Sequence, residues 1–104
     1  MSGYLIVFTT CDSQQCAEAI TETLLQNRLA ACVQQGGTRS HYIWQGEQQQ
    51  AEEITLTIKT RAALWEKVEA AIRANHTYDT PEIIAWSVSH GHAPYLNWIN
   101  EVTA

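Results

Sequence analysis

One stretch of this sequence is too long, when fully extended, to fit inside a compact domain made from the whole chain. Within residues 29–44, the segments 29–33 and 41–44 have strand-like sequences, and Gly36 and Gly37 lie between them. As a β-strand, residues 29–44 would reach ~50 Å at about 3.3 Å per residue. A compact chain of 104 residues is roughly 34 Å across. The stretch must therefore bend sharply at the glycine pair, as at a β-bulge, or project beyond the domain.

Side-chain periodicity predicts the other elements. Apolar residues at 54, 56 and 58 alternate with polar neighbours, which indicates a strand with one buried face. Leu64, Val68, Ala71 and Ile72 form a single apolar stripe at helical spacing. The expected strands are 4–10, 29–44, 53–60 and 83–89, with a hairpin tip at 46–50, and the expected helices are 13–27, 61–75 and 95–102.

Capping signals and the order of elements together indicate the fold class. Asp12 and Ser13 provide an N-cap for the first helix, with Gln15 three residues after Asp12 as a capping-box partner. Thr60 is placed to cap the second helix, which we expect to end at Asn75. The order β-α-β-β-α-β plus a helix predicts an α+β, ferredoxin-like fold: an antiparallel sheet, helices on one face, and a long hairpin between the second and third strands. We expect a single domain over residues 1–104.

Composition and charge narrow the class of protein. Eleven acidic and six basic residues give a net charge of −5, and no basic block could neutralise a run of phosphates, so we expect no nucleic-acid partner. No apolar run approaches the ~18–20 residues needed to span a bilayer. The start of the chain lacks the positive charge and the long apolar stretch of a signal peptide. These features predict a soluble, cytoplasmic protein without a membrane partner.

Cysteine and histidine residues supply candidate metal ligands. The three cysteines, at positions 11, 16 and 32, are an odd number and do not follow a paired C-x-x-C zinc pattern. Cys11 follows the first strand, Cys16 lies about one turn inside the first helix, and His90 and His92 follow the last strand. Imidazole suits copper, zinc and nickel, so these four residues are candidate ligands. Alternatively, the cysteines are small core residues, as we expect for Cys32, and the histidines lie in a solvated loop.

A polar loop between the second helix and the last strand offers a second candidate site. His76, Tyr78 and Glu82 bring three hydrogen-bonding groups to one short segment, and Pro81 favours an extended backbone before the last strand. Lys59 ends the polar face of the third strand, where it could converge with this loop. We interpret the group as a pocket for a small ligand or ion, in which the carboxylate and the lysine tune each other. A structural ion pair that fastens the loop is the alternative.

The predicted hairpin carries two large apolar groups. Tyr42 and Trp44 share one face of it, and a projecting sheet edge invites pairing with other chains. We therefore expect the hairpin to be buried between the subunits of a homo-oligomer. The alternative is a monomer whose sheet folds over at Gly36 and Gly37.

Five segments match, in order and with fitting spacing, those of a known family. They are 28–33 (Arg-Leu-Ala-Ala-Cys-Val), 42–46 (Tyr-Ile-Trp-Gln-Gly), 58–60 (Ile-Lys-Thr), 76–83 (His-Thr-Tyr-Asp-Thr-Pro-Glu-Ile) and 95–99 (Tyr-Leu-Asn-Trp-Ile). Together they resemble the CutA family, the divalent-cation tolerance proteins, from Leu5 to Ile99. Thr77 stands where the family usually has proline. Cys11 and Cys16 lie outside the matched segments.

The resemblance implies a ferredoxin-like fold, similar in architecture to the PII signalling proteins, and a tight homotrimer held by the long hairpins. It also implies tolerance to copper and other divalent cations, with copper binding reported in the family and no established enzymatic activity. The chain itself contains no nucleophile elbow, phosphate-binding glycine loop or metalloprotease motif.

These observations support three functional hypotheses. The leading one is a trimeric, cytoplasmic protein that binds divalent metal ions, copper foremost, in a binding or signalling role without an organic cofactor. Its pocket lies between subunits and is lined by Tyr42, Trp44, Lys59, His76, Tyr78 and Glu82. The second is a PII-like module for a small anionic metabolite, in which Lys59 supplies the charge and Trp44 or Tyr42 a stacking surface. The third is an interaction scaffold without a small ligand, and a tolerance role also suggests a still unidentified protein partner.

Overall fold

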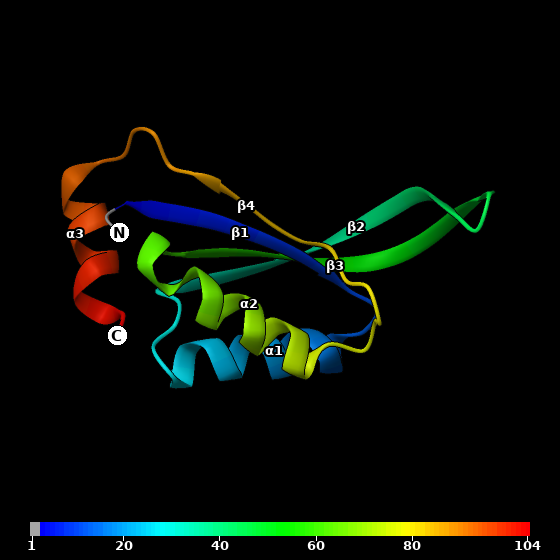
Figure 1. Ribbon diagram of the computed structural model, residues 1–104, viewed down its shortest axis with the longest axis horizontal. Coiled ribbons are helices and arrows are strands. Elements are labelled where there is room, and N and C mark those ends of the chain that lie inside the picture. Colours follow the sequence, from blue (N-terminus) through cyan, green and yellow to red (C-terminus); the bar gives the residue numbers. More distant parts are fainter. Residues whose placement is uncertain (1–2) are drawn as a thin grey trace.

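The computed structural model describes residues 3–104 and has the predicted order of elements. The strands are β1 (Tyr4–Cys11), β2 (Cys32–Trp44), β3 (Glu47–Arg61) and β4 (Ile83–Ser87). The α-helices are α1 (Gln14–Gln26), α2 (Trp65–Asn75) and α3 (Ala93–Val102), and a 3-10 turn (Ala62–Leu64) precedes α2. Together they form an α+β, ferredoxin-like fold, which confirms the predicted fold class (Figure 1).

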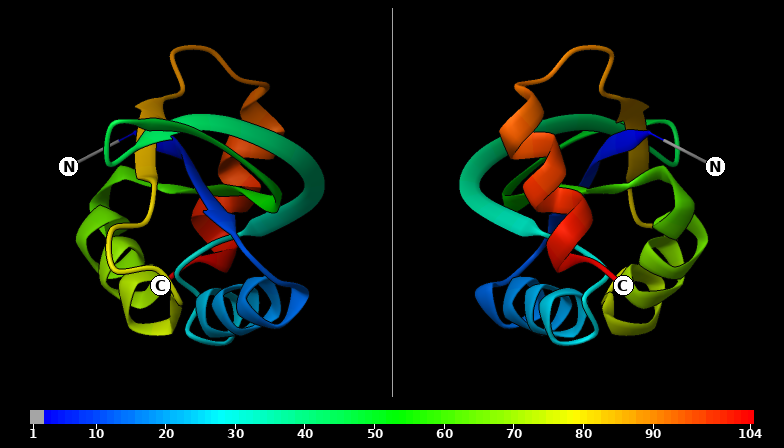
Figure 2. Two further views of the ribbon diagram at one scale, coloured as in Figure 1. Left: turned by 90° about the vertical axis from the view of Figure 1, so that its right-hand side faces the viewer. Right: turned by 90° about the vertical axis from the view of Figure 1, so that its left-hand side faces the viewer.

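The four strands form one antiparallel sheet in the order β2-β3-β1-β4. β1 is central, with Val7 opposite Ile58 of β3 on one side and Ala85 of β4 on the other. Helices α1 and α2 cover one face of the sheet, as predicted (Figure 1). Helix α3 lies instead at the end of the sheet away from the hairpin tip, and the two end-on views place it beside the sheet (Figure 2).

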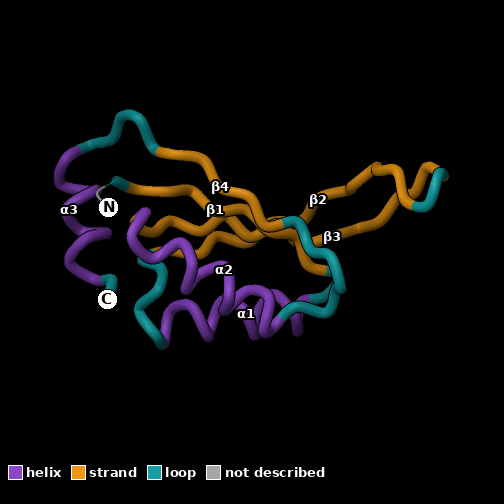
Figure 3. Tube along the Cα trace, viewed as in Figure 1, coloured by secondary structure: helices purple, strands orange, loops and turns teal. Residues whose placement is uncertain are grey.

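The β2–β3 hairpin projects well beyond the rest of the domain (Figure 3). Its ladder runs from Cys32 to Trp44 through the glycine pair at 36 and 37 with no extra residue on either strand. Of the two alternatives, a β-bulge at the glycines is excluded because the pairing register does not change there, and the projecting hairpin is the one found (Figure 3). The longest dimension of the molecule is 44 Å, against 26 and 22 Å for the other two. β2 is thus accommodated, despite its length, because it projects beyond the compact part of the domain.

The hairpin tip is a two-residue turn at Gln45 and Gly46, and not the longer segment 46–50 that we expected. Both residues have positive φ angles, 51° and 80°. This is the geometry of a type I′ turn, whose twist matches that of the flanking strands. Residues 47–50 belong to β3, which therefore begins at Glu47 and not at Glu53.

The core lies between the sheet and the two helices that cover it. Leu56 and Ile58 are fully buried, which confirms the alternation predicted for β3. The helices contribute the predicted apolar stripes: Ala17, Ile20 and Leu24 from α1, and Val68 and Ile72 from α2, with Leu64 just before it. Burying a large aliphatic side chain contributes about 1.5–3 kcal/mol. This packing therefore fixes the positions of α1, α2 and the residues at their ends.

Of the two capping predictions, the one for α1 is confirmed at Ser13 and the one for α2 is wrong. Ser13 is the residue that caps α1, because its Oγ accepts a hydrogen bond from the Cys16 backbone N–H at 3.1 Å. The Asp12 carboxylate accepts a hydrogen bond from the loop after α2 instead. Thr60 is fully buried within β3, and its hydroxyl donates to the Leu29 carbonyl at 2.6 Å. Since β3 continues past Thr60, this residue cannot cap α2.

The last strand is shorter than predicted, and two of its large apolar residues are exposed. β4 ends at Ser87, and Ile83 and Ala85 are the residues that pack against the core. Ile84 and Trp86 lie on the other face and are 49% and 48% exposed. The outer face of the sheet therefore carries large apolar groups in addition to those of the hairpin.

Candidate functional site

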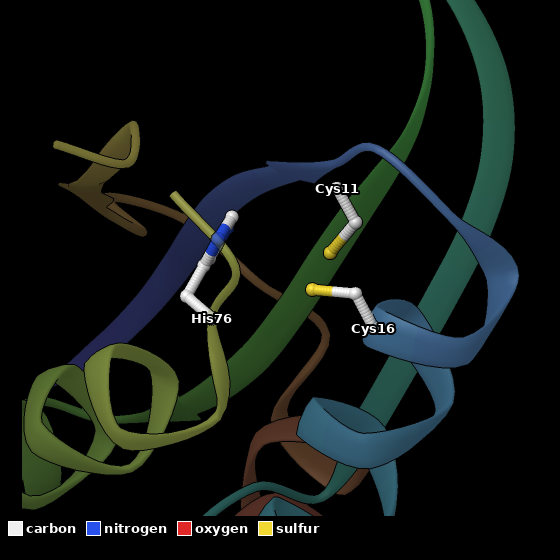
Figure 4. A group of neighbouring side chains, drawn as sticks. All are labelled: Cys11, Cys16 and His76. Atoms are coloured by element: carbon white, nitrogen blue, oxygen red, sulfur yellow. The ribbon is translucent and has the colours of Figure 1, made fainter. Parts of the chain in front are cut away.

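Cys11, Cys16 and His76 meet at the end of the sheet from which the hairpin projects (Figure 4). Cys11 is the last residue of β1, Cys16 lies in the first turn of α1, and His76 directly follows α2. Two thiol sulfurs and one imidazole nitrogen lie within 4.8 Å of one another. Cys11 is 0% and Cys16 4% exposed, and His76 is partly exposed. The packing of α1 and α2 on the sheet thus brings three side chains that could hold a metal ion to one largely buried position.

Hydrogen bonds engage both ring nitrogens of His76. Nδ1 accepts from the Tyr78 backbone N–H at 3.2 Å, so in the neutral ring the proton is assigned to Nε2. Nε2 lies 2.8 Å from the Thr10 carbonyl oxygen, to which it donates, and 3.3 Å from the Thr9 hydroxyl. To bind a metal ion, the imidazole must give up one of these contacts.

Polar groups at the end of α2 and in the loop after it contact the Cys16 thiol. Thr77 Oγ1 lies 3.9 Å from Cys16 Sγ and donates a 2.9 Å hydrogen bond to Asp12 Oδ1. The Cys16 thiol donates to the Asn75 carbonyl oxygen at 3.9 Å. Burial raises the pKa of Cys11 to about 12, and the adjacent Cys16 thiol and nearby carboxylates act in the same direction. Without a metal ion, Cys11 is therefore a neutral thiol at pH 7.

We expect the metal-free protein to lose stability as the pH rises above 9. Below that pH, the Cys11 thiol is protonated in both the folded and the unfolded chain. Above it, the unfolded chain releases the proton at the ordinary pKa of 9.0, whereas the folded chain holds it to about 12. The unfolded state is therefore favoured progressively, by at most about 1.4 kcal/mol per pH unit. Urea unfolding of the reduced protein in the presence of a chelator, at pH near ~8 and ~10, measures the change.

Cys11→Ala is the matched variant for this prediction. It removes the titrating thiol and leaves Cys16 and Cys32 in place. The cavity lowers the free energy of unfolding at every pH, so the quantity compared is its change with pH. The same change in both proteins would contradict the assignment of this alkaline destabilisation to Cys11.

A second contact ties the loop after α2 to the base of the hairpin. The Tyr78 hydroxyl donates to Glu53 Oε2 at 2.6 Å. Burial and this carboxylate raise the pKa of Tyr78 well above its usual range, so the phenol remains a donor. The Tyr78 ring centre lies 5.0 Å from that of His76. The predicted pocket does not include Glu53. The sequence pattern of β3 identifies Glu53 as a polar strand residue but gives no sign of its contact with Tyr78.

Lys59 lies apart from this loop within one chain. Its Nζ donates to Gln34 Oε1 at 2.7 Å. Ile54, opposite Cys11 in the sheet, is five positions before Lys59 along β3. Five strand residues span about 17 Å. The loop is fastened by the Tyr78–Glu53 hydrogen bond, and Lys59 is engaged elsewhere.

The remaining predicted pocket residues are exposed and do not meet within one chain. Glu82 is exposed just before β4. Tyr42 and Trp44 lie on the projecting part of the hairpin and are 44% and 54% exposed. A pocket that contains all of these side chains therefore requires more than one copy of the chain.

His90 and His92 lie far from the cysteines in the fold. Both are exposed in the loop between β4 and α3. Because β4 runs antiparallel to β1, this loop lies near the start of β1, whereas Cys11 lies at its end. Of the four predicted metal ligands, the structure brings together Cys11 and Cys16, and it adds His76. The sequence did not predict that His76 lies beside the cysteines, because it is distant from both of them along the chain.

An antiparallel four-stranded sheet with two helices on one face and a projecting hairpin defines the chain as a ferredoxin-like α+β protein. Its distinctive feature is the thiol–imidazole cluster between the end of the sheet and the helices. The model of the CutA1 divalent ion tolerance protein family matches residues 5–102, and the chain belongs to this family. The predicted resemblance is thereby confirmed.

Relatives match over almost the full length of the chain. The divalent-cation tolerance protein CutA of Pyrococcus horikoshii is 37% identical over 99 residues, covering 95% of this chain and 97% of that protein. The crystal structure of CutA from Xylella fastidiosa is 42% identical, has a TM-score of 0.94, and covers 99% of this chain and 100% of that one.

Relatives are not confined to one compartment. The structure of CutA from Archaeoglobus fulgidus, described as periplasmic, is 33% identical with a TM-score of 0.92, covering 95% of this chain and 97% of that one. A relative in Arabidopsis thaliana, 36% identical over 100 residues, is described as chloroplastic; the match covers 95% of this chain and 55% of that protein. Among residues 3–104, no helix combines the length and apolar character needed to cross a membrane.

Proposed function

We propose that this protein serves divalent-cation tolerance by binding a metal ion at Cys11, Cys16 and His76, with copper as the preferred ion. The observation that carries the proposal is the convergence of two thiols and an imidazole within 4.8 Å in a member of this family. The role is binding or signalling, and the ion is held as cargo or signal without catalysis.

The ligand types favour a thiophilic ion. Thiolate sulfur selects copper(I) and zinc, imidazole suits copper and zinc, and copper stands highest in the affinity order of divalent first-row metals. At metal–ligand distances of about 2.0–2.3 Å, the three ligand atoms would need to approach one another by about 1 Å at most. Because metals bind the thiolate, the ion displaces the thiol protons. A reducing compartment such as the cytoplasm would keep both sulfurs available for it.

The second part of the proposal is a homotrimer held together by the hairpins. Tyr42, Ile43 and Trp44 are 44%, 66% and 54% exposed in the isolated chain, and a projecting apolar group of this kind favours a protein–protein interface. Between subunits, the hairpin of one chain would complete a pocket with the loop of another. That pocket would contain Tyr42 and Trp44 of the hairpin and His76, Tyr78 and Glu82 of the loop. Lys59 lies at the other end of β3 from the hairpin tip, so a further subunit of the trimer would have to supply it.

A copper titration of the reduced, metal-free protein against a chelator of known affinity tests the metal site. We expect one ion per chain. Cys16→Ser removes one of three ligands and should weaken binding by at least about 100-fold, since even residues that only orient a ligand contribute about 10–100-fold. Cys32→Ser is the matched control, because Cys32 lies on β2 opposite Lys59 and outside the cluster.

The control decides how the titration is interpreted. Cys32→Ser should bind copper like the unaltered protein. An equal loss of affinity in Cys32→Ser and Cys16→Ser would contradict the assigned site. So would a Cys16→Ser protein that retains full affinity, because copper would then be bound elsewhere.

A further inference from the structure

We infer that Cys11 and Cys16 are also a disulfide-forming pair, and that their oxidation by a peroxide closes the metal site. The regulatory consequence rests on the proposed metal-binding function. Disulfide formation itself rests only on the geometry of the two cysteines, so the two parts can be tested separately.

The first observation is the approach of the two sulfurs. Cys11 leaves the end of β1 and Cys16 leaves the first turn of α1, and the two side chains point toward each other (Figure 4). Their sulfur atoms lie within 4.8 Å. A disulfide needs about 2.04 Å between the sulfurs, so oxidation must bring them closer by at most about 2.8 Å, and only two residues connect β1 to α1.

The third cysteine cannot take part within the chain. Cys32 begins β2 opposite Lys59, whereas Cys11 is opposite Ile54. Those two positions on β3 are about 17 Å apart. An intramolecular disulfide in this protein therefore has one possible pairing, Cys11 with Cys16.

A small oxidant can reach the pair from the loop after α2. Cys16 is 4% exposed and Cys11 is 0% exposed, so Cys16 is the less deeply buried of the two residues. Thr77 is exposed, and its hydroxyl lies 3.9 Å from Cys16 Sγ. We expect hydrogen peroxide to reach Cys16 beside this exposed side chain, and bulky disulfides to react more slowly because both cysteines are buried.

The chemistry consumes one peroxide per disulfide. The Cys16 thiolate attacks one peroxide oxygen, so that an S–O bond forms, the O–O bond breaks and one water leaves after protonation. The Cys11 sulfur then attacks the sulfenic sulfur of Cys16, so that the S–S bond forms and the sulfenic oxygen leaves as a second water. The two sulfurs are together oxidised by two electrons, and the peroxide is reduced by the same two.

Metal binding and the disulfide use the same two sulfur atoms. A disulfide sulfur is no longer a thiolate, so oxidation removes two of the three ligands and leaves His76 alone. A bound ion, in turn, coordinates the Cys16 sulfur that would attack the peroxide and the Cys11 sulfur that would attack the sulfenic intermediate. Each state therefore protects the protein from entering the other.

The test uses hydrogen peroxide with zinc as the metal, because zinc does not itself cycle between oxidation states. Trypsin cleavage at Arg28 separates Cys11 and Cys16 from Cys32. We expect the oxidised peptide 1–28 to be lighter by two hydrogen atoms, and zinc affinity to fall by at least about 100-fold. A thiol reductant should restore that affinity. Zinc-loaded protein should form the disulfide more slowly than metal-free protein.

Cys32→Ser should behave like the unaltered protein, whereas Cys16→Ser should not form the internal disulfide. The inference is overturned if peptide 1–28 keeps both thiols while Cys32 is oxidised, or if the disulfide forms and zinc affinity is unchanged. If the reduced protein binds neither zinc nor copper but the disulfide forms, the proposed metal function fails and the disulfide assignment stands.

Discussion

Trp44→Lys is expected to convert the proposed trimer into a monomer. Trp44 is 54% exposed in the isolated chain and lies near the tip of the hairpin that we propose to hold the trimer together. A lysine there would bring a charge into an apolar interface, where an unpaired charge costs several kcal/mol. Within one hairpin, however, the lysine would lie opposite Glu47 and could pair with it across the strands. The substitution therefore acts on assembly and leaves the hairpin formed.

Sedimentation at micromolar concentration separates the outcomes, because the chain mass is 11.7 kDa and a trimer has three times that mass. Trp44→Phe is the matched control, since it keeps an apolar aromatic ring at the same position. We expect the control to remain trimeric. A Trp44→Lys protein that still sediments as a trimer would show that the hairpin is not the element of assembly.

The fold was largely predictable, because the spacing of apolar residues along each strand and helix shows which of its faces packs against the other layer. Alternation at Leu56 and Ile58 and the helical stripe through Val68 and Ile72 identify the faces that are buried. The hairpin was harder to predict for two reasons. The glutamines at 48–50 have the composition of a loop but are held in β3 by pairing with β2. The glycines at 36 and 37 suggested a bulge, but the ladder runs through them without one. A side chain would have room at either position, since no atom lies within 4 Å of a Cβ added there.

The candidate site was predictable only where it is local. Cys11 and Cys16 are brought together by the end of one strand and the first turn of the next helix, which sequence spacing can anticipate. His76 was recognised as a polar loop residue, but its approach to the thiols depends on how α2 packs beside α1. Glu53 was missed for the same reason, since its partner Tyr78 comes from that loop. Contacts between elements distant along the chain have no counterpart in local periodicity.

The second large effect is expected in the core packing of α1, the helix that carries Cys16. Ile20 lies one helical turn after Cys16 on the same face of α1 and is fully buried. Ile20→Ala should lower the free energy of unfolding by about 2–5 kcal/mol, a large share of the roughly 5–15 kcal/mol of a typical domain. Urea unfolding at a fixed protein concentration measures it. Glu22→Ala, on the exposed face, should change it by no more than about 0.5 kcal/mol.

Metal affinity distinguishes a loss of stability from a loss of the site in the same variant. Cys16 is also held by the Ser13 cap and by its contact with the Asn75 carbonyl, neither of which involves Ile20. Below the unfolding midpoint, Ile20→Ala should therefore bind copper with nearly unchanged affinity, although it unfolds at a lower urea concentration. A large fall in affinity under folding conditions would mean that the core packing of α1, and not its N-terminal contacts, holds the thiol in place. The binding and stability of this protein would then be one cooperative property, and a change at any core position of α1 would alter its response to metal.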